Sequence, residues 1–182
     1  MNKLKTLTLT GLTILGIAAL AASSAATRTE IDERVAATMK EFKALHTGNA
    51  ELDAKAYGVL VFPRITKAGV GVAGEYGEGV LQVRGKTVGY YSVGAASVGL
   101  TLGLAKHSEV IMFMNQQSLD KFTSSKGWSI GADAGITVVS KSANEKYDSA
   151  LDTKPILAFG FAEKGLIADL SLDGTKISEI KK

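Results

Sequence analysis

A stripe of apolar residues with helical spacing follows the first two dozen positions. Its members recur at intervals of four, four, three and three: Ile31, Val35, Met39, Phe42 and Leu45. This spacing puts them on one helical face, with polar residues opposite. Thr27 and Glu30 have the spacing of a capping box. The pattern predicts an amphipathic helix over 27–46 with Gly48 as its stop, and a shorter helix over 50–56.

Downstream of Val59 the pattern changes to that of strands. Val59–Phe62 is a short apolar run that Pro63 is predicted to end. From Ser97 to Ala105, valine and leucine alternate with small residues, which is typical of a strand whose one face another element approaches closely. Further apolar runs are Val110–Met114 and the alternating Trp128–Val139, and one or two helical turns are predicted between them, at Gln117–Phe122.

The C-terminal region has the pattern of two consecutive hairpins. Strands over 156–161, 166–172 and 176–180 are separated by Glu163–Gly165 and by Asp173-Gly174, a strong turn signal. Eleven glycines lie between Gly58 and Gly103. Serial hairpins and dense glycine predict an α+β fold: a mainly antiparallel, curled sheet or small barrel behind an N-terminal amphipathic helix. We expect one domain over 27–182, with a mobile polar loop at Ser140–Leu151.

The first 22 residues have the pattern of a secretory signal peptide. Lys3 and Lys5 precede an uncharged run, and small residues suited to cleavage follow within 21–26. An uncleaved anchor is the weaker alternative, because the run holds four threonines and two glycines. The chain has no cysteine, which excludes a lipoprotein anchor, disulfides and thiolate zinc sites. We therefore expect a periplasmic or secreted protein.

Charge and motifs exclude several function classes. The net charge of +3 falls to +1 once Lys3 and Lys5 are removed, so basicity gives no argument for nucleic acid. Gly69–Gly74 matches G-x-G-x-x-G, but the following residues are poor helix formers, so no nucleotide cofactor is predicted.

The remaining polar and aromatic candidates also have ordinary structural interpretations. His46 is expected to end the helix and His107 to be solvated in a turn. Glu75 and Glu78 are interpreted as exposed hairpin charges, and Trp128 as a core residue that opens a strand, although it could stack on a ligand. No catalytic constellation, metal site or cofactor is predicted, and we expect no enzyme.

The chain resembles the SYLF lipid-binding domain family. The motifs that carry the resemblance keep their order from about Tyr57 to Lys182: Tyr57–Pro63, Lys67–Val72, Gly74–Gly79, Tyr90–Ser92, Phe113-Met114, Leu119–Phe122, Gly127-Trp128 and Lys154–Ile156. The family includes exported bacterial proteins and a eukaryotic branch associated with phosphoinositide-containing membranes and actin filaments. The resemblance implies a non-enzymatic phospholipid-binding module; the alternative is an envelope protein-interaction scaffold that does not bind lipid.

The resemblance also implies a site, because the family's membrane attachment is credited to an amphipathic helix before the glycine-rich core. Thr29–Leu45 matches that helix by position and pattern. Arg34, Lys40 and Lys43 would then meet lipid phosphates, while Val35, Met39 and Phe42 enter the interface. A second candidate pair, Arg64 and Lys67, flanks the Phe62-Pro63 motif. The simpler interpretation is that the apolar stripe docks on the core and that these cations are ordinary solvated surface.

Overall fold

The computed structural model describes residues 26–125, 127–130, 135–140, 144, 149–167, 170, 172 and 174–182, and only the backbone of 97–102 and 149–150. In chain order the elements are α2 (Arg28–Leu45), α3 (Thr47–Lys55), β1 (Gly58–Val83), β2 (Lys86–Phe113), α4 (Gln116–Ser124), β3 (Trp128–Ser129), β4 (Ile136–Val138), the 3₁₀ turn η1 (Ser149–Thr153), β5 (Ile156–Ala162), β6 (Gly165–Leu166) and β7 (Lys176–Ile180). This is the predicted α+β fold, with the amphipathic helix at its start.

One sheet of seven strands is built around β2. Along one edge, β2 pairs with β1 from Phe113 back to Lys86. Its other edge pairs with β7 near the start of the strand and with β5 near the end. All pairs are antiparallel except β4 with β5. Among the described strands the two ends of the order, β3 and β4, do not meet, so the sheet is curled but open and the small-barrel alternative is excluded.

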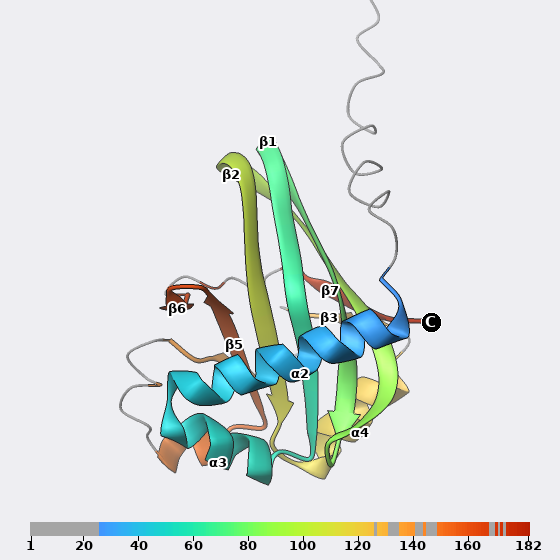
Figure 1. Ribbon diagram of the computed structural model, residues 1–182, viewed down its shortest axis with the longest axis vertical. Coiled ribbons are helices and arrows are strands. Elements are labelled where there is room, and N and C mark those ends of the chain that lie inside the picture. Colours follow the sequence, from blue (N-terminus) through green and yellow to red (C-terminus); the bar gives the residue numbers. More distant parts are fainter. Residues whose placement is uncertain are drawn as a thin grey trace, which may run out of the picture.

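The β1–β2 hairpin is long and folded back on itself. A tight turn at Arg84 and Gly85, both with positive φ, joins the two strands. Both strands then rise past the helices and reverse direction, so the hairpin forms a protrusion at the top of Figure 1. Register shifts at Val70–Val72 mark the reversal in β1. The first half of β1 therefore runs beside the second half.

Glycines make the contact between the two halves of β1 possible. A Cβ atom added to Gly79 would overlap the carbonyl oxygen of Val61, and one added to Gly77 would lie 2.8 Å from the carbonyl oxygen of Arg64. Only a residue without a side chain allows two backbones to approach this closely. The glycine-rich composition thus serves the curling of the sheet, as the sequence predicted.

The helix α2 lies across the outside of the sheet (Figure 1). It begins with the predicted capping box: the Thr27 side chain accepts a hydrogen bond from the Glu30 backbone N–H, and the Glu30 carboxylate accepts one from the Thr27 N–H. The helix ends at Leu45 with His46 as its C-cap. Gly48 is not the stop, because it lies in the first turn of α3, where its N–H donates to Nδ1 of His46.

Replacing Thr27 with alanine tests the capping box. The change removes the acceptor for the Glu30 N–H, so we expect the free energy of unfolding to fall by about 1 kcal/mol. Urea denaturation followed by circular dichroism measures it. Thr29→Ala is the matched control, since Thr29 is an exposed residue of the same helical turn. An equal loss in both variants would contradict a specific capping role.

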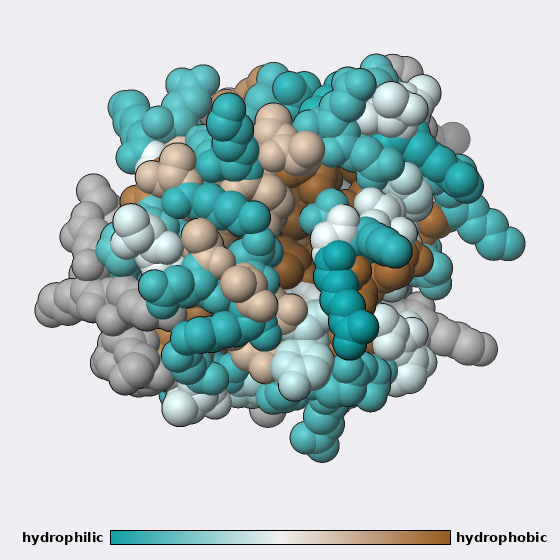
Figure 2. Space-filling view, turned by 60° about the horizontal axis from the view of Figure 1, so that its bottom comes forward, coloured by the Kyte–Doolittle hydropathy of each residue, from teal (hydrophilic) through white to brown (hydrophobic). Residues whose placement is uncertain are grey.

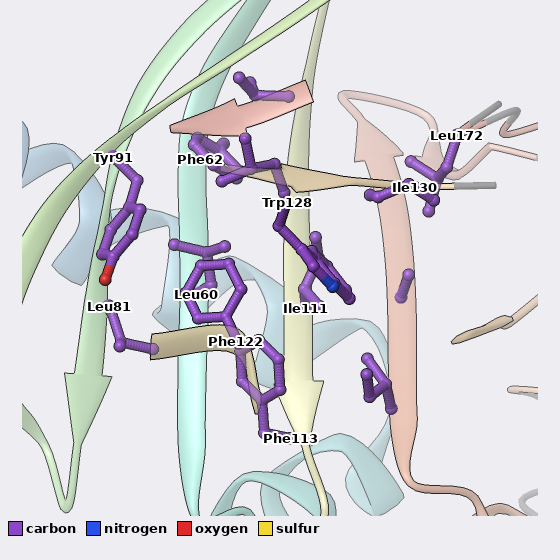
Figure 3. Packing of buried hydrophobic residues seen from close by; sticks show 14 of the residues in the cluster. Leu60, Phe62, Leu81, Tyr91, Ile111, Phe113, Phe122, Trp128, Ile130 and Leu172 are labelled. Atoms are coloured by element: carbon purple, nitrogen blue, oxygen red, sulfur yellow. The ribbon is translucent and has the colours of Figure 1, made fainter. Parts of the chain in front are cut away.

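The core consists of two clusters on opposite faces of the sheet. One lies between the sheet and the two N-terminal helices and includes Val35, Phe42, Val61 and Phe159. The other fills the concave side, where Trp128, Phe122 and Phe113 pack together under the curled strands (Figure 3). Trp128 is 3% exposed and opens β3, so its interpretation as a core residue is confirmed.

Two strand predictions are wrong. Pro63 does not end the first strand, because a β-bulge between Phe62 and Ile65 takes up the residue that lacks an N–H donor. The second C-terminal hairpin is also absent from the described residues, since β7 pairs with β2 and β3. Much of the predicted 166–172 strand and of the predicted mobile loop at 140–151 lies outside the described residues.

Candidate functional site

The apolar side of α2 is buried in the core. The exposed fractions of Val35, Met39 and Phe42 are 0%, 8% and 0%. The Phe42 ring packs edge-on against Phe159, with 4.9 Å between the ring centroids. The structure therefore confirms that the stripe docks on the core, and these three side chains reach a lipid only if the helix leaves it.

Polar contacts add to the docking of the N-terminal half of α2. The Tyr90 hydroxyl donates to the Asp32 carboxylate at 2.9 Å, and the Arg28 guanidinium lies 5.7 Å from the centre of the Tyr90 ring. Burial raises the pKa of the Tyr90 phenol, and the Asp32 carboxylate raises it further. These contacts tie the helix to β2 as well as to the apolar core.

The cations of α2 point away from the core. Arg34, Lys40 and Lys43 are all exposed. The Lys43 ammonium forms an ion pair with Asp53 of α3 at 2.6 Å, so its charge is partly compensated. Glu33 and Glu41 are also exposed on this helix. The outer face of α2 is thus charged and mixed in sign, with its basic members accessible.

The second candidate pair lies on β1, the strand that α2 packs against. Arg64 occupies the bulge after Pro63 and is exposed. Lys67 is half-buried, and its ammonium forms an ion pair with Glu75 at 2.7 Å, which links the two halves of β1 below the point where the strand reverses. Arg64 is therefore an accessible cation, whereas Lys67 has a structural partner.

Glu75 and Glu78 are not the exposed hairpin charges that the sequence predicted. Glu75 pairs with Lys67, and Glu78 pairs with the ammonium of Lys182 at 2.8 Å. The Tyr76 hydroxyl donates to the second oxygen of Glu78. Burial, together with the Glu78 charge, raises the pKa of Tyr76 to about 12. Because β1 folds back on itself, the carboxylates of Glu75 and Glu78 are partly buried and paired with lysines. The sequence around them could not indicate this burial.

His107 likewise differs from its prediction. It lies within β2, not in a turn, and its Nε2 is 3.1 Å from Oε1 of Glu109. Glu109 is 3% exposed, and its other oxygen is buried without a hydrogen-bond partner. The two groups form a buried pair on the strand. Within the described part of the chain, no cluster of three acidic or histidine side chains could hold a metal ion.

A small cleft lies where α4 begins. It has a volume of about 160 Å³ and is lined mostly by apolar surface, from Asn115, Gln117, Ser118, Lys121, Trp128, Pro155 and Ile156. This end of the molecule faces the viewer in Figure 2, where apolar residues are visible near the centre between hydrophilic ones. The cleft was not predicted, because its lining comes from three separate stretches of sequence.

The fold and the surface together define a class of protein. Accessible cations and exposed apolar side chains lie on its outer surfaces, which is consistent with a binding module. None of the helices that the structure describes has the length and apolarity needed to cross a bilayer.

The comparison with known families agrees with this class. Residues 94–182, just under half of the chain, match the Ysc84 family model, described as "Las17-binding protein actin regulator". The match runs from within β2 to the last residue. This match to the C-terminal part of the chain agrees with the resemblance of its motifs to the SYLF family. Curated proteins gave no match.

Proposed function

We propose that this protein is an exported, non-enzymatic module that binds phospholipid membranes at their surface. The observation that carries the proposal is the orientation of α2. Its apolar face is fixed in the core, while Arg34, Lys40 and Lys43 are exposed on the remaining surface of the helix. The match of residues 94–182 to a binding-domain family supports a binding role in preference to catalysis.

The expected strength of this contact is modest. A lysine or arginine close to an anionic leaflet contributes about 1 kcal/mol, and the contribution falls off within a Debye length. Asp53 and the exposed Glu33 and Glu41 reduce the sum. Attraction through this face alone is therefore weak and salt-dependent, and stable attachment requires a second, apolar contribution.

Co-sedimentation with vesicles tests the proposal. The mature protein should pellet with vesicles containing anionic phospholipid, and less so as salt is raised. Failure to pellet with either anionic or zwitterionic vesicles would contradict membrane binding. Mass spectrometry of lipids that co-purify with the protein then identifies the preferred headgroup.

Charge reversal on α2 tests whether the exposed cations of this helix contact the membrane. Arg34→Glu combined with Lys40→Glu should weaken binding to anionic vesicles about tenfold or more, because four units of charge change beside the membrane. The matched control combines Lys154→Glu and Lys164→Glu, two exposed lysines outside α2, for the same change in net charge. Equal loss in both pairs would show that only net charge matters and would remove α2 from the site.

Export to the periplasm or beyond is the second part of the proposal. The cleavage interval 21–26 ends just before Thr27, so cleavage there would leave the capping box whole. Intact-mass measurement of the protein isolated from the cell envelope checks this. A mass that includes residues 1–22 would instead indicate the uncleaved anchor.

A protein-binding scaffold is the second candidate function. It is favoured by the family description, which names binding to a protein and regulation of actin. A pull-down from envelope extract that recovers one stoichiometric protein, together with no binding to any vesicle, would favour the scaffold over the membrane module.

A further inference from the structure

The reversal of the β1–β2 hairpin exposes aliphatic side chains at the tip of a protrusion. The exposed fractions are 77% for Val70, 59% for Val72 and 65% for Leu104. Val70 and Val72 flank Gly71 in β1, and Leu104 lies opposite Ala68. Gly71 and Gly103 both have positive φ, which lets the two strands bend here. We refer to residues 68–74 and 95–105 as the hairpin tip.

The hairpin tip lies apart from both core clusters. Most large apolar side chains described for this protein are buried, whereas three of the most exposed ones gather at this single place. Figure 1 shows the tip rising beyond α2, at the opposite end of the molecule from α3 and α4. Exposed apolar side chains gathered at one place mark an interaction surface.

Charge identifies the partner. Residues 68–74 and 95–105 contain no charged side chain, while Lys67, Glu75 and Lys106 stand at the base of the tip. Lys67 and Glu75 form an ion pair, so the excess positive charge there comes from Lys106. Lys106 is exposed and pairs across the strands with Thr66, the neighbour of Lys67. Arg64, also exposed, is the next basic residue down β1. An anionic bilayer has phosphates at its surface and acyl chains beneath them. A hairpin that enters tip first would bring its aliphatic side chains to the acyl chains and the lysine behind them to the phosphates.

The backbone at the tip sets how deeply the hairpin can enter a bilayer. The ladder between β1 and β2 is interrupted at the reversal: Val70 lies opposite Leu102 and Val72 opposite Val98, so Gly71 and residues 99–101 fall within a register shift. Backbone groups that pair within the hairpin cost little to remove from water. The register shift and the outer edges of the two strands leave backbone groups outside the ladder, so entry is shallow, to the depth of Val70, Val72 and Leu104, where water of the interfacial layer still reaches them.

We propose that the hairpin tip inserts into the interfacial layer of anionic phospholipid bilayers, with Val70, Val72 and Leu104 among the acyl chains and Lys106 at the phosphates. This inference rests on the proposed function and supplies the apolar contribution that α2 cannot provide while docked. Insertion of the α2 stripe would require Phe42 and Val35 to leave the core, whereas the tip needs no rearrangement.

Site-specific fluorescence on the full chain tests insertion. The protein has no cysteine, so Val70→Cys and Leu104→Cys each give one labelling site for the environment-sensitive dye NBD. Ala54→Cys on the exposed side of α3, at the other end of the molecule, is the control. With phosphatidylglycerol-containing vesicles, we expect a severalfold rise and a blue shift at positions 70 and 104, quenching there by spin-labelled lipid, and no change at position 54.

The outcomes separate the two proposals. If the protein co-sediments but probes at both tip positions keep their aqueous emission, the insertion proposal is overturned and the surface binding of α2 stands. If the protein does not co-sediment, both proposals fail. If tip emission rises with protein concentration in the absence of vesicles, the tip contacts a second copy of the chain and the lipid assignment is overturned.

A charged tip gives a second test that does not depend on labelling. Val70→Asp combined with Leu104→Asp should lower the affinity for anionic vesicles about tenfold or more, since carboxylates resist entry into an apolar layer. The melting temperature should stay unchanged, because neither side chain packs in the core. Val88→Asp is the control, a 58%-exposed valine of β2 near the other end of the hairpin. An equal loss per introduced charge in the control would overturn insertion.

Discussion

Replacing Phe42 with alanine is expected to lower the free energy of unfolding by about 3–5 kcal/mol. The Phe42 side chain is fully buried between α2 and β5, and it contacts the rings of both Phe159 and Phe161. Truncation removes the transfer free energy of the ring and leaves a cavity that these neighbours only partly fill. Urea denaturation, followed by the fluorescence of the single tryptophan and by circular dichroism, measures the loss.

Two further variants define what the Phe42 result means. Phe42→Leu keeps most of the volume, so it should cost clearly less than alanine and remain measurable if the alanine variant fails to fold. Val88→Ala removes an exposed apolar side chain and should change stability by no more than about 0.5 kcal/mol. If Phe42→Ala also cost so little, α2 would spend much of its time undocked, and insertion of its stripe into lipid would become the better account of membrane binding.

Gly79→Ala is expected to lower the free energy of unfolding by about 3 kcal/mol, toward the upper end of the usual cost of overpacking. The added methyl group would overlap the Val61 carbonyl oxygen and approach Phe62 at 2.7 Å. Backbone cannot rotate away as a flexible side chain can, so the two halves of β1 must separate. Both core clusters would be disturbed, because Val61 belongs to one and Phe62 to the other.

Gly74→Ala is the matched control for Gly79. It lies in the same strand, but an added Cβ would meet no atom within 4 Å. Alanine also restricts the unfolded chain, so stability should stay the same or rise by up to about 1 kcal/mol. If the two variants were equally destabilised, the cost would come from the loss of glycine itself and not from the contact between the halves of β1.

The local patterns of the sequence predicted the helices and the general fold class well. Helical spacing identified the face of α2 that is buried, and Thr27 with Glu30 identified its start. These features depend on neighbours within one or two turns of the chain. The lengths of β1 and β2 could not be predicted in this way, because Pro63 is normally a strand terminator and the bulge that accommodates it depends on pairing with residues near 108.

The candidate site could be predicted only in part. Arg34, Lys40 and Arg64 are accessible as expected, but the ion pairs of Lys43 and Lys67 depend on partners that the tertiary fold supplies. Val70 and Leu104 looked like ordinary strand residues, and their exposure follows from a reversal of both strands that no short motif marks. Glu78 and His107 were assigned to solvent for the same reason: the elements that cover them are remote in sequence.

The tight turn at Arg84 and Gly85 also bears on how the chain acquires its structure. Pairing of β1 with β2 starts at Val83 and Lys86, and each later pair adds to chain that is already ordered. No large loop has to close until Tyr91 meets Glu179 or Met112 meets Leu157. Since closing long loops slows folding, the hairpin is placed to form early and to serve as the template on which β5 and β7 assemble.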